Sequence, residues 1–292
     1  MLAKSTYASG ITPSNLNLIT NYIYSYTGHN ISIYKLPFIH RCINNRINST
    51  YVADVNDYIE LLRSNHNEIL GLLKLFMIRV TQFFRDTHVF NLLINDVVPR
   101  LMQNKFHERS IRIWIPGCCT GEEAYSFAMI IHHYMEKMGV LYDVKIFATD
   151  IDPESLKKAN TGIYNNDAAS TIDKEWLNKY FIKAVDGYQI TQKIRNMVVF
   201  GYHDLINQPP FTKMDLISCR NLLIYIDEKK QAILPPLFHH SLCENGILVL
   251  GTSESIQNLE KYFNPISLKS KIFCKNNQNS LVQAFLNFPT KH

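Results

Sequence analysis

The stretch IRIWIPGCCTGEEAYSFAM, residues 111–129, decides the fold. Its first residues are mostly apolar and predict a buried strand. Residues 117–121 follow as a tight turn bounded by two glycines. An apolar-periodic run then predicts a helix from Glu122 onwards, with Thr120 as its N-cap. Strand, glycine turn and helix in this order are typical of the first unit of a nucleotide-binding α/β domain, because glycine lets the backbone approach a ligand closely.

Composition indicates a globular protein with room for one large domain or two ordinary ones: the chain has 292 residues, 46% hydrophobic and 19% charged. The net charge of +5 suits a partner with acidic patches but is too small to require nucleic acid. We find no signal-peptide pattern and no apolar run of membrane-spanning length, so we expect a cytoplasmic protein that does not insert into membranes.

Cysteine and histidine patterns give no sign of a metal site. The six cysteines include no CxxC pair, and we expect reduced thiols. The histidine pairs at 132–133 and 239–240 are adjacent in sequence, so within each pair the side chains point different ways on a helix. We therefore expect no bound metal.

Periodicity along the chain predicts a helical region, then an α/β region. The predicted early helices cover residues 16–26, 35–48, 55–64 (capped by Asp54) and 68–80, with a linker helix over 90–106. Buried strands are predicted at 111–115, 143–149, 215–219 and 247–250, and antiparallel strands at 181–184, 188–194 and 197–200. Further helices are predicted at 152–159, 174–180 and after Asp227, the last one broken by the prolines at 235–236. The predicted division is 1–90 helical, 91–110 linker helix, 111–276 α/β with a β-subdomain at about 180–201, and 277–292 a flexible tail.

The glycine turn favours a cationic ligand over a dinucleotide. It lacks the third glycine of GxGxxG, and Glu122 and Glu123 in the first helical turn would repel a pyrophosphate. S-adenosylmethionine (SAM) carries an ammonium and a positive sulfur that these acids would attract. Asp150 ends the next strand, where such folds place the carboxylate that binds a ribose. The alternative is a capping pair of glutamates and an ordinary strand-end aspartate.

Two other segments carry chemistry but are ambiguous when taken alone. Residues 81–85, TQFFR, follow an apolar helix, and core packing explains their phenylalanines equally well. Residues 219–225, CRNLLIY, follow a buried strand at the rim where α/β sheets bind ligands, although Tyr225 could simply pack. The loop NQPPF at 207–211 is similar to a box found in DNA amino-methyltransferases, but it precedes its strand rather than following it, which favours a plain loop.

Taken together, the motifs are identified as those of a known family. TQFFRD at 81, GCCTGEEAYSFAM at 117, FATDID at 147, DLISCRNLLIYID at 215 and GILVLGTSES at 246 resemble, in order and spacing, the chemotaxis receptor methyltransferases, CheR. The resemblance implies a SAM-dependent protein-glutamate O-methyltransferase. It also implies a fold: an all-α N-terminal domain, then a Rossmann-like SAM methyltransferase α/β domain with an inserted small antiparallel β-subdomain.

The resemblance also implies roles for individual residues. Arg85 and Tyr225 would lie beside the reactive methyl group, and these two are the expected catalytic residues. Glu123 would hold the ammonium of SAM, and Asp150 its ribose. The complete set expected around SAM and its product S-adenosylhomocysteine (SAH) is Thr81, Arg85, Gly117, Gly121, Glu123, Asp150, Asp204, Leu205, Arg220 and Asn221.

Several positions depart from the family pattern. Arg79 and Asp204 stand where the family usually has asparagine, which could change SAM affinity. The helix over 35–48 corresponds to the family's basic docking helix, and Arg41 and Arg46 with their neighbours would contact the cytoplasmic helical domain of receptors. The hairpin turn at 186–187 is short, so we expect no tether to a receptor's C-terminal pentapeptide.

Two other functions are consistent with parts of the sequence. A non-catalytic SAM-binding scaffold of the same fold would fit the changes at Arg79 and Asp204. A nucleic-acid methyltransferase would fit the basic isoelectric point and the loop at 207–211, but we expect no nucleic-acid partner.

Overall fold

The computed structural model describes residues 10–277, which fall into two compact units. The first is helical and contains residues 10–78 together with Tyr225–Lys230. The second is an α/β unit formed by Arg79–Ile224 and, among the described residues, 231–277. The boundary at residue 78 precedes the division that we expected at residue 90. The reason is that Phe83 and Phe90 are buried in the core of the α/β unit.

Four helices build the first unit: α1 (Pro13–Thr27), α2 (Leu36–Thr50), α3 (Val55–Ser64) and α4 (His66–Phe76). The Asp54 side chain accepts hydrogen bonds from the backbone N–H groups of Asn56 and Asp57, and so caps α3 as predicted. Helix α4 ends at Phe76, short of the predicted residue 80, because Met77 leaves the helical conformation. The apolar faces of these helices form a small core that contains Ile19, Ile23, Ile43, Tyr58, Leu62 and Leu72.

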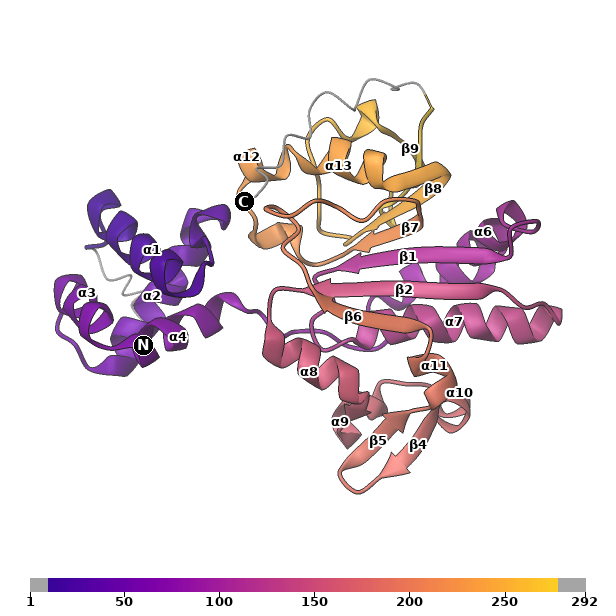
Figure 1. Cartoon of the computed structure of the whole chain (residues 1–292), viewed down its shortest axis with the longest axis horizontal. Coiled ribbons are helices and arrows are strands. Elements are labelled where there is room, and N and C mark those ends of the chain that lie inside the picture. Colours follow the sequence, from indigo (N-terminus) through magenta and orange to yellow (C-terminus); the bar gives the residue numbers. More distant parts are fainter. Residues whose placement is uncertain (1–9, 278–292) are drawn as a thin grey trace, which may run out of the picture. The chain divides into compact units, whose positions relative to one another are not determined.

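A seven-stranded sheet in the order β6-β2-β1-β7-β8-β10-β9 forms the centre of the second unit (Figure 1). Its strands are β1 (Ser110–Pro116), β2 (Asp143–Asp150), β6 (Val198–Tyr202), β7 (Met214–Cys219), β8 (Leu242–Leu250), β9 (Phe263–Ser267) and β10 (Ile272–Lys275). The strands β6, β2, β1, β7 and β8 run parallel, whereas β9 and β10 are antiparallel additions. Buried apolar residues fill both faces of the central strands, as expected for a parallel sheet covered by helices.

Helices cover this sheet and connect its strands. Ahead of β1 lie α5 (Thr87–Leu92), a π-helical turn (Leu93–Val97) and α6 (Val98–Asn104), which replace the single predicted linker helix. Helix α7 (Glu122–Met138) follows β1 and packs on β2 and β6, and α8 (Pro153–Thr161) also packs on β2 and β6 (Figure 1). The helix predicted after Asp227 is interrupted, but before the prolines: α12 (Glu228–Gln231) is short, and the proline pair lies in the first turn of α13 (Leu234–Ser241).

A three-stranded antiparallel sheet is inserted between β2 and β6. It consists of β3 (Ile163–Tyr164), β5 (Gly187–Ile190) and β4 (Phe181–Ala184), with α9 (Asn166–Ser170) and α10 (Lys174–Tyr180) beside it. The predicted strand 188–194 ends at Ile190, where the chain turns into α11 (Gln192–Arg195). The predicted strand at 197–200 is β6, and it lies in the large sheet, paired in parallel with β2. Alternation of apolar residues marks a strand, but it does not say which sheet the strand joins.

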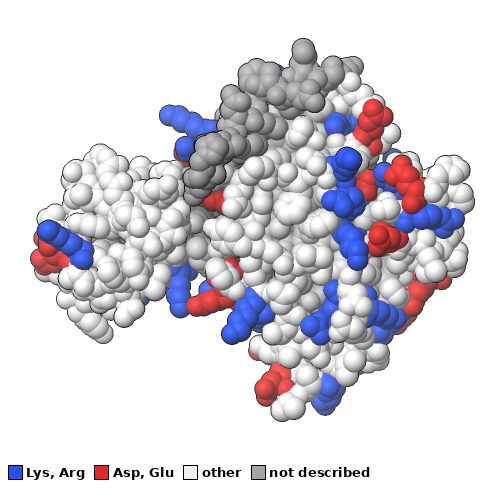
Figure 2. All heavy atoms as spheres, in the orientation of Figure 1, with Lys and Arg blue, Asp and Glu red and all other residues white. Residues whose placement is uncertain are grey.

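Of the predicted tail, residues 278–292 lie outside the described residues. Within residues 10–277, no helix is long and apolar enough to span a membrane. All six cysteines are free thiols. On the face shown in Figure 2, basic and acidic side chains are interspersed.

Candidate functional site

The expected cofactor residues lie mainly where four parallel strands end. The strands β1, β2, β6 and β7 end at Pro116, Asp150, Tyr202 and Cys219. Because parallel strands present their carboxyl ends at the same edge, the loops that follow them meet there. These loops, with the last residue of β2, contribute Gly117, Gly121, Asp150, Asp204, Leu205, Arg220 and Asn221.

The turn between β1 and α7 needs glycine at both ends. Gly117 has φ 71° and Gly121 has φ 93°, in the left-handed region that side chains disfavour. A Cβ on Gly121 would lie 3.0 Å from the Ala159 Cβ and 3.0 Å from the Phe200 ring. Gly121 is also the residue at the N-cap of α7, so the predicted Thr120 cap is wrong. The Thr120 hydroxyl instead donates to the Glu122 carboxylate at 2.7 Å.

Asp150 holds this turn from the end of β2. Its carboxylate accepts the backbone N–H of Cys119 at 2.8 Å and that of Asp152 at 2.9 Å. Burial raises the pKa of Asp150 above its ordinary value, although these backbone hydrogen bonds oppose the rise. A carboxylate fixed by backbone donors in this position is suited to accept hydrogen bonds from a ribose diol.

Glu123 is paired with Arg220. Arg220 Nη1 donates to the Glu123 carboxylate at 2.9 Å, and the Ser218 hydroxyl donates to its other oxygen at 2.7 Å. The Arg220 side chain has 0% exposure, and its Nη2 also donates to the Arg85 carbonyl and the Asp86 carboxylate, each at 2.8 Å. One buried guanidinium thus connects the loop after β7, the first turn of α7 and the segment before α5.

The segment over 81–86 is fixed on α7. The Phe84 N–H donates to the Ser126 hydroxyl at 3.0 Å, and Phe84 and Asp86 have φ values of 49° and 61°. Arg85 is partly exposed, and one of its guanidinium nitrogens donates to the Val80 carbonyl at 3.0 Å. Thr81 is also partly exposed. Backbone strain at two residues that flank Arg85 indicates that the surroundings fix the path of this segment.

The remaining residues expected to contact the cofactor are Asp204, Leu205 and Asn221. The Asp204 carboxylate accepts hydrogen bonds from Ile206 N, Asn207 N and Asn207 Nδ2, and Leu205 is buried. Asn221 has a φ of 58°. Asp204 and Asn221 therefore set the backbone conformation of their loops.

A buried glutamate that the sequence analysis missed supports the loop that follows Arg220. The Glu254 carboxylate accepts the N–H groups of Leu223 at 2.8 Å and Gly251 at 2.6 Å. Burial raises the pKa of Glu254, while backbone hydrogen bonds oppose the rise. The acidic residue in GTSES, directly after a buried strand, was the signal for it.

The donors and acceptors at this edge fit SAM. Its amino-acid end carries both an ammonium and a carboxylate, and the Glu123–Arg220 pair offers both charges. Arg220 Nε is buried and has no hydrogen-bond partner among the described residues, which leaves one donor for a carboxylate. Gly117 and Gly121 leave both ends of the turn without a side chain, and Asp150 suits the ribose. The groups at this edge whose chemistry suits SAM are thus Glu123, Arg220, Asp150 and the glycine turn.

Tyr225 and the expected docking arginines belong to the helical unit. The Tyr225 carbonyl accepts the Lys35 N–H at 2.8 Å, and its ring lies 5.2 Å from that of Phe38. Arg41 is exposed, with its guanidinium 5.2 Å from the centre of the same Phe38 ring. These contacts place Tyr225 and Arg41 around one aromatic side chain of α2.

Arg46 is engaged within the helical unit. It donates from Nε to Glu68 at 2.8 Å and makes a second contact with the same carboxylate. Glu68 is buried and also accepts the Tyr58 hydroxyl, so the Arg46 charge is compensated inside this unit.

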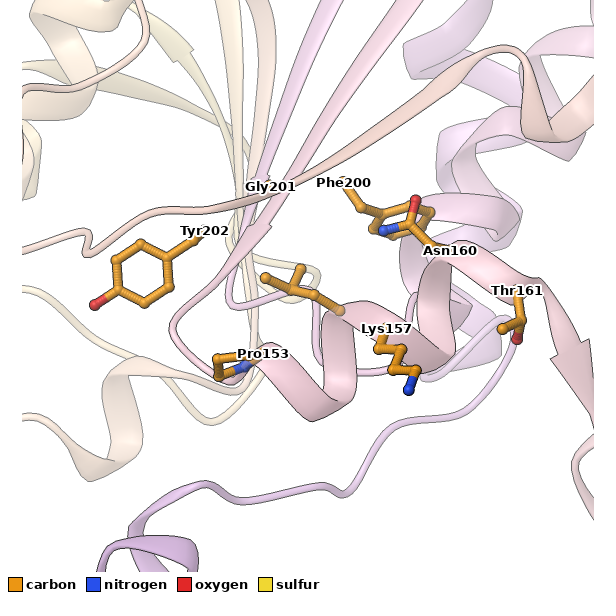
Figure 3. A pocket seen from close by; sticks show the side chains of 8 residues that line it. Pro153, Lys157, Asn160, Thr161, Phe200, Gly201 and Tyr202 are labelled. Atoms are coloured by element: carbon orange, nitrogen blue, oxygen red, sulfur yellow. The ribbon is translucent and has the colours of Figure 1, made fainter. Parts of the chain in front are cut away.

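A separate open hollow of about 630 Å³ lies between α8 and β6 (Figure 3). It is lined by Pro153, Leu156, Lys157, Asn160, Thr161, Phe200, Gly201 and Tyr202, and no expected site residue is among them. Over residues 10–277, no group of histidine, cysteine, aspartate or glutamate side chains is arranged to hold a metal ion.

Comparison with known proteins covers most of the chain. Residues 79–272 match the CheR methyltransferase SAM-binding domain, and residues 14–77 match the CheR methyltransferase all-alpha domain. The chain is 33% identical over 269 residues to a chemotaxis protein methyltransferase of Borreliella burgdorferi, covering 89% of this chain and 95% of that protein. The corresponding protein of Escherichia coli is 28% identical over 274 residues, covering 90% and 92%.

One relative is much longer. An uncharacterized 104.1 kDa protein of Rhodobacter capsulatus is 34% identical over 240 residues, and the match covers 82% of this chain but 25% of that protein. Both domain matches agree with the two units of the structure. The chain therefore belongs to the CheR methyltransferase family and is a SAM-dependent methyltransferase, with that family's all-α domain preceding its SAM-binding domain.

Proposed function

We propose that this enzyme transfers a methyl group from SAM to glutamate side chains of chemotaxis receptors, which yields glutamate methyl esters and SAH. The observation that carries the proposal is the buried Glu123–Arg220 pair. It offers a carboxylate and an N–H donor to a zwitterionic amino acid, and it also holds the Arg85 backbone. Two chemotaxis methyltransferases matched over most of their length support the receptor as substrate.

For this methyl transfer, the protein mainly has to position the two reactants and exclude water. SAM, when bound, supplies a methyl group on a positively charged sulfur. A glutamate with a pKa of about 4.3 is already ionised near neutral pH, so no strong general base is needed. The chain has to bring the carboxylate oxygen to attack distance and remove its water.

Arg85 and Tyr225 are the residues that we assign to the substrate carboxylate. Arg85 has five N–H donors, one of which contacts Val80, and the others can form a charge-assisted bidentate contact with a carboxylate. Tyr225 would donate a hydrogen bond or form a wall beside the transfer path. Thr81, on the same segment as Arg85, would contact the amino-acid end of SAM. Asp204 and Leu205 would flank the adenine, and Arg220 and Asn221 would close the pocket.

The enzyme would bind the cytoplasmic helical domain of the receptor. Arg41 is the better candidate for docking, because Arg46 already compensates Glu68. The connection between β4 and β5 has only Val185 and Asp186, which supports a mode of docking without a pentapeptide tether.

Methyl transfer from radiolabelled SAM to receptor-rich membranes tests the proposal. The wild-type enzyme should produce base-labile label, and Arg85→Ala should abolish it while thermal melting shows that the fold persists. Arg100→Ala is the matched control, because Arg100 pairs with Asp96 on an exposed helical face. Alkali-stable label would contradict esterification and indicate N-methylation. SAH binding without transfer to any receptor would indicate a non-catalytic scaffold.

A further inference from the structure

Arg79 forms a three-point contact with the start of α8. Its Nε donates to Asp152 Oδ2 at 2.6 Å, and its Nη2 donates to Asp152 Oδ1 at 3.1 Å and to Glu154 Oε2 at 2.8 Å. The two contacts with Asp152 form the parallel bidentate arrangement that a planar guanidinium provides and an asparagine cannot reach. Since the Glu154 side chain is 56% exposed, the Asp152 contact carries most of the interaction.

Asp152 is nearly buried and fully used. Its side chain is 7% exposed, and it accepts the Glu154 N–H at 3.1 Å and the Ser155 hydroxyl at 2.6 Å while it pairs with Arg79. Burial alone would raise the pKa of Asp152, but the hydrogen bonds from Arg79 and Ser155 hold it below its ordinary value. Asp152 thus stays ionised and caps α8.

Asp152 also connects directly to the ribose candidate. The Asp152 N–H donates to Asp150 Oδ1 at 2.9 Å, and the other Asp150 oxygen accepts the Cys119 N–H at 2.8 Å. A continuous series of contacts therefore runs from the Arg79 guanidinium through Asp152 to Asp150 and the glycine turn. At its other end, Arg79 lies in the same segment as Thr81 and Arg85, directly before the residues expected at the methyl-donor end.

We propose that Arg79 is a positioning residue for the SAM site. It fixes the segment over 79–85 to the residues that hold Asp150, so that the ribose side and the methyl-donor side of the site keep one spacing. The proposal rests on the proposed function, because it assumes that Asp150 and Arg85 act on one bound cofactor. It goes beyond that function in assigning a role to a residue outside the set expected to hold SAM.

SAH titration by calorimetry tests the proposal. Arg79→Asn should weaken SAH binding about 3- to 10-fold, the size expected when a partly exposed charge-assisted contact is lost. In kinetics, KM for SAM should rise by a similar factor, with little change in kcat at saturating SAM. Arg79→Lys keeps the charge but loses the planar fork, and should fall between wild type and Arg79→Asn.

A double-mutant cycle tests whether Arg79 acts on SAH binding through Asp152. Asp152→Asn keeps an N-cap acceptor and removes the ion pair, so it should weaken binding to a similar extent. The double variant Arg79→Asn/Asp152→Asn should be little worse than either single variant. Arg100→Asn removes an exposed pair remote from these contacts and should bind SAH as wild type does.

The following results would contradict the positioning role of Arg79. If Arg79→Asn and Arg79→Lys lower the melting temperature but bind SAH as tightly as wild type, Arg79 is only structural and the inference is wrong. Additive effects in the cycle would equally overturn the route through Asp152. If wild-type protein itself fails to bind SAH, the proposed function fails and the inference with it. Should Arg79→Asn not fold, Arg79→Lys and Asp152→Asn give the same comparison of affinity with melting temperature.

Discussion

The Arg220 guanidinium donates to the Glu123 carboxylate across 2.9 Å, and the Arg220 side chain is fully buried. The same guanidinium reaches the Arg85 carbonyl and the Asp86 carboxylate. A buried charge that lost these partners would be costly, so the loop after β7, α7 and the segment over 85–86 are held together by one side chain. This contact joins sequence motifs that lie far apart along the chain.

Arg220→Lys should lower the free energy of unfolding by about 3 kcal/mol, since one ammonium cannot reproduce contacts with three groups from a buried position. SAH affinity should fall as well, because Glu123 loses its orientation. Urea denaturation and calorimetry measure the two effects, and Arg100→Lys is the exposed control. A variant as stable as wild type would show that the buried pair does not organise the site.

Gly121→Ala should destabilise the protein more than Gly139→Ala. Both glycines have positive φ, 93° and 63°, so both variants incur backbone strain of about 1 kcal/mol. At Gly121 the new Cβ would meet other atoms at 3.0 Å, whereas at Gly139 it would meet nothing within 4 Å among the described residues. The difference between the two melting temperatures therefore reports the close approach of Ala159 and Phe200 to the turn, and equal losses would contradict it.

SAH affinity should fall as pH is lowered from neutral into the weakly acidic range. In the proposed site, ribose hydroxyls would donate to the ionised form of Asp150. Burial raises the pKa of this carboxyl, so protonation begins at a higher pH than in an exposed aspartate. Calorimetry over a pH series should show this loss in wild type, and a flatter profile with weaker binding in Asp150→Asn. Parallel profiles for the two proteins would assign the titration to another group.

The raised pKa of Asp150 also makes the free energy of unfolding depend on pH. A carboxyl whose folded pKa lies above its unfolded pKa binds its proton more tightly in the folded state. Its contribution to stability is therefore greatest below the unfolded pKa and is lost as pH rises through the folded pKa. The unfolding free energy of wild type relative to Asp150→Asn should accordingly decrease from acidic to neutral pH.

Glu254→Gln should cost about 2 kcal/mol, because an amide has one acceptor oxygen for the N–H groups of Gly251 and Leu223, and its own NH₂ would face a donor. The neutral amide avoids the cost of burying a charge, which is the cost that raises the Glu254 pKa, and this reduces the loss of stability. Glu260→Gln, on an exposed residue of the same unit, is the control for urea denaturation. No difference between the two variants would show that the loop over 220–223 does not depend on Glu254.

Local sequence was sufficient where structure depends on neighbouring residues. The strand at 110–116, the glycine turn and the helix from Glu122 follow from periodicity and from the conformational freedom of glycine. Asp54 caps its helix as predicted, since a cap involves only the next few residues. Thr120 failed as a cap because Gly121 takes the left-handed conformation and the Thr120 hydroxyl turns to Glu122.

Features that depend on distant residues could not be predicted from the sequence. β6 joins the large sheet by pairing with β2, and no local pattern distinguishes this from the small sheet. Arg79 was seen only as a departure from the family pattern, because its partner Asp152 is 73 residues away. The Arg46–Glu68 pair links α2 to α4, so a charge that we expected on the docking surface is compensated inside the helical unit.

Receptor methylation should distinguish Arg41 from Arg46. Arg41→Ala should raise KM for receptor without lowering the melting temperature, because the exposed guanidinium rests on the Phe38 ring and such a contact contributes little. Arg46→Ala should instead lower the unfolding free energy by about 3 kcal/mol, since it leaves the buried Glu68 carboxylate uncompensated. Arg46→Ala with Glu68→Gln should recover part of this stability. If Arg46→Ala proved as stable as wild type and raised KM for receptor, Arg46 would be a docking residue after all.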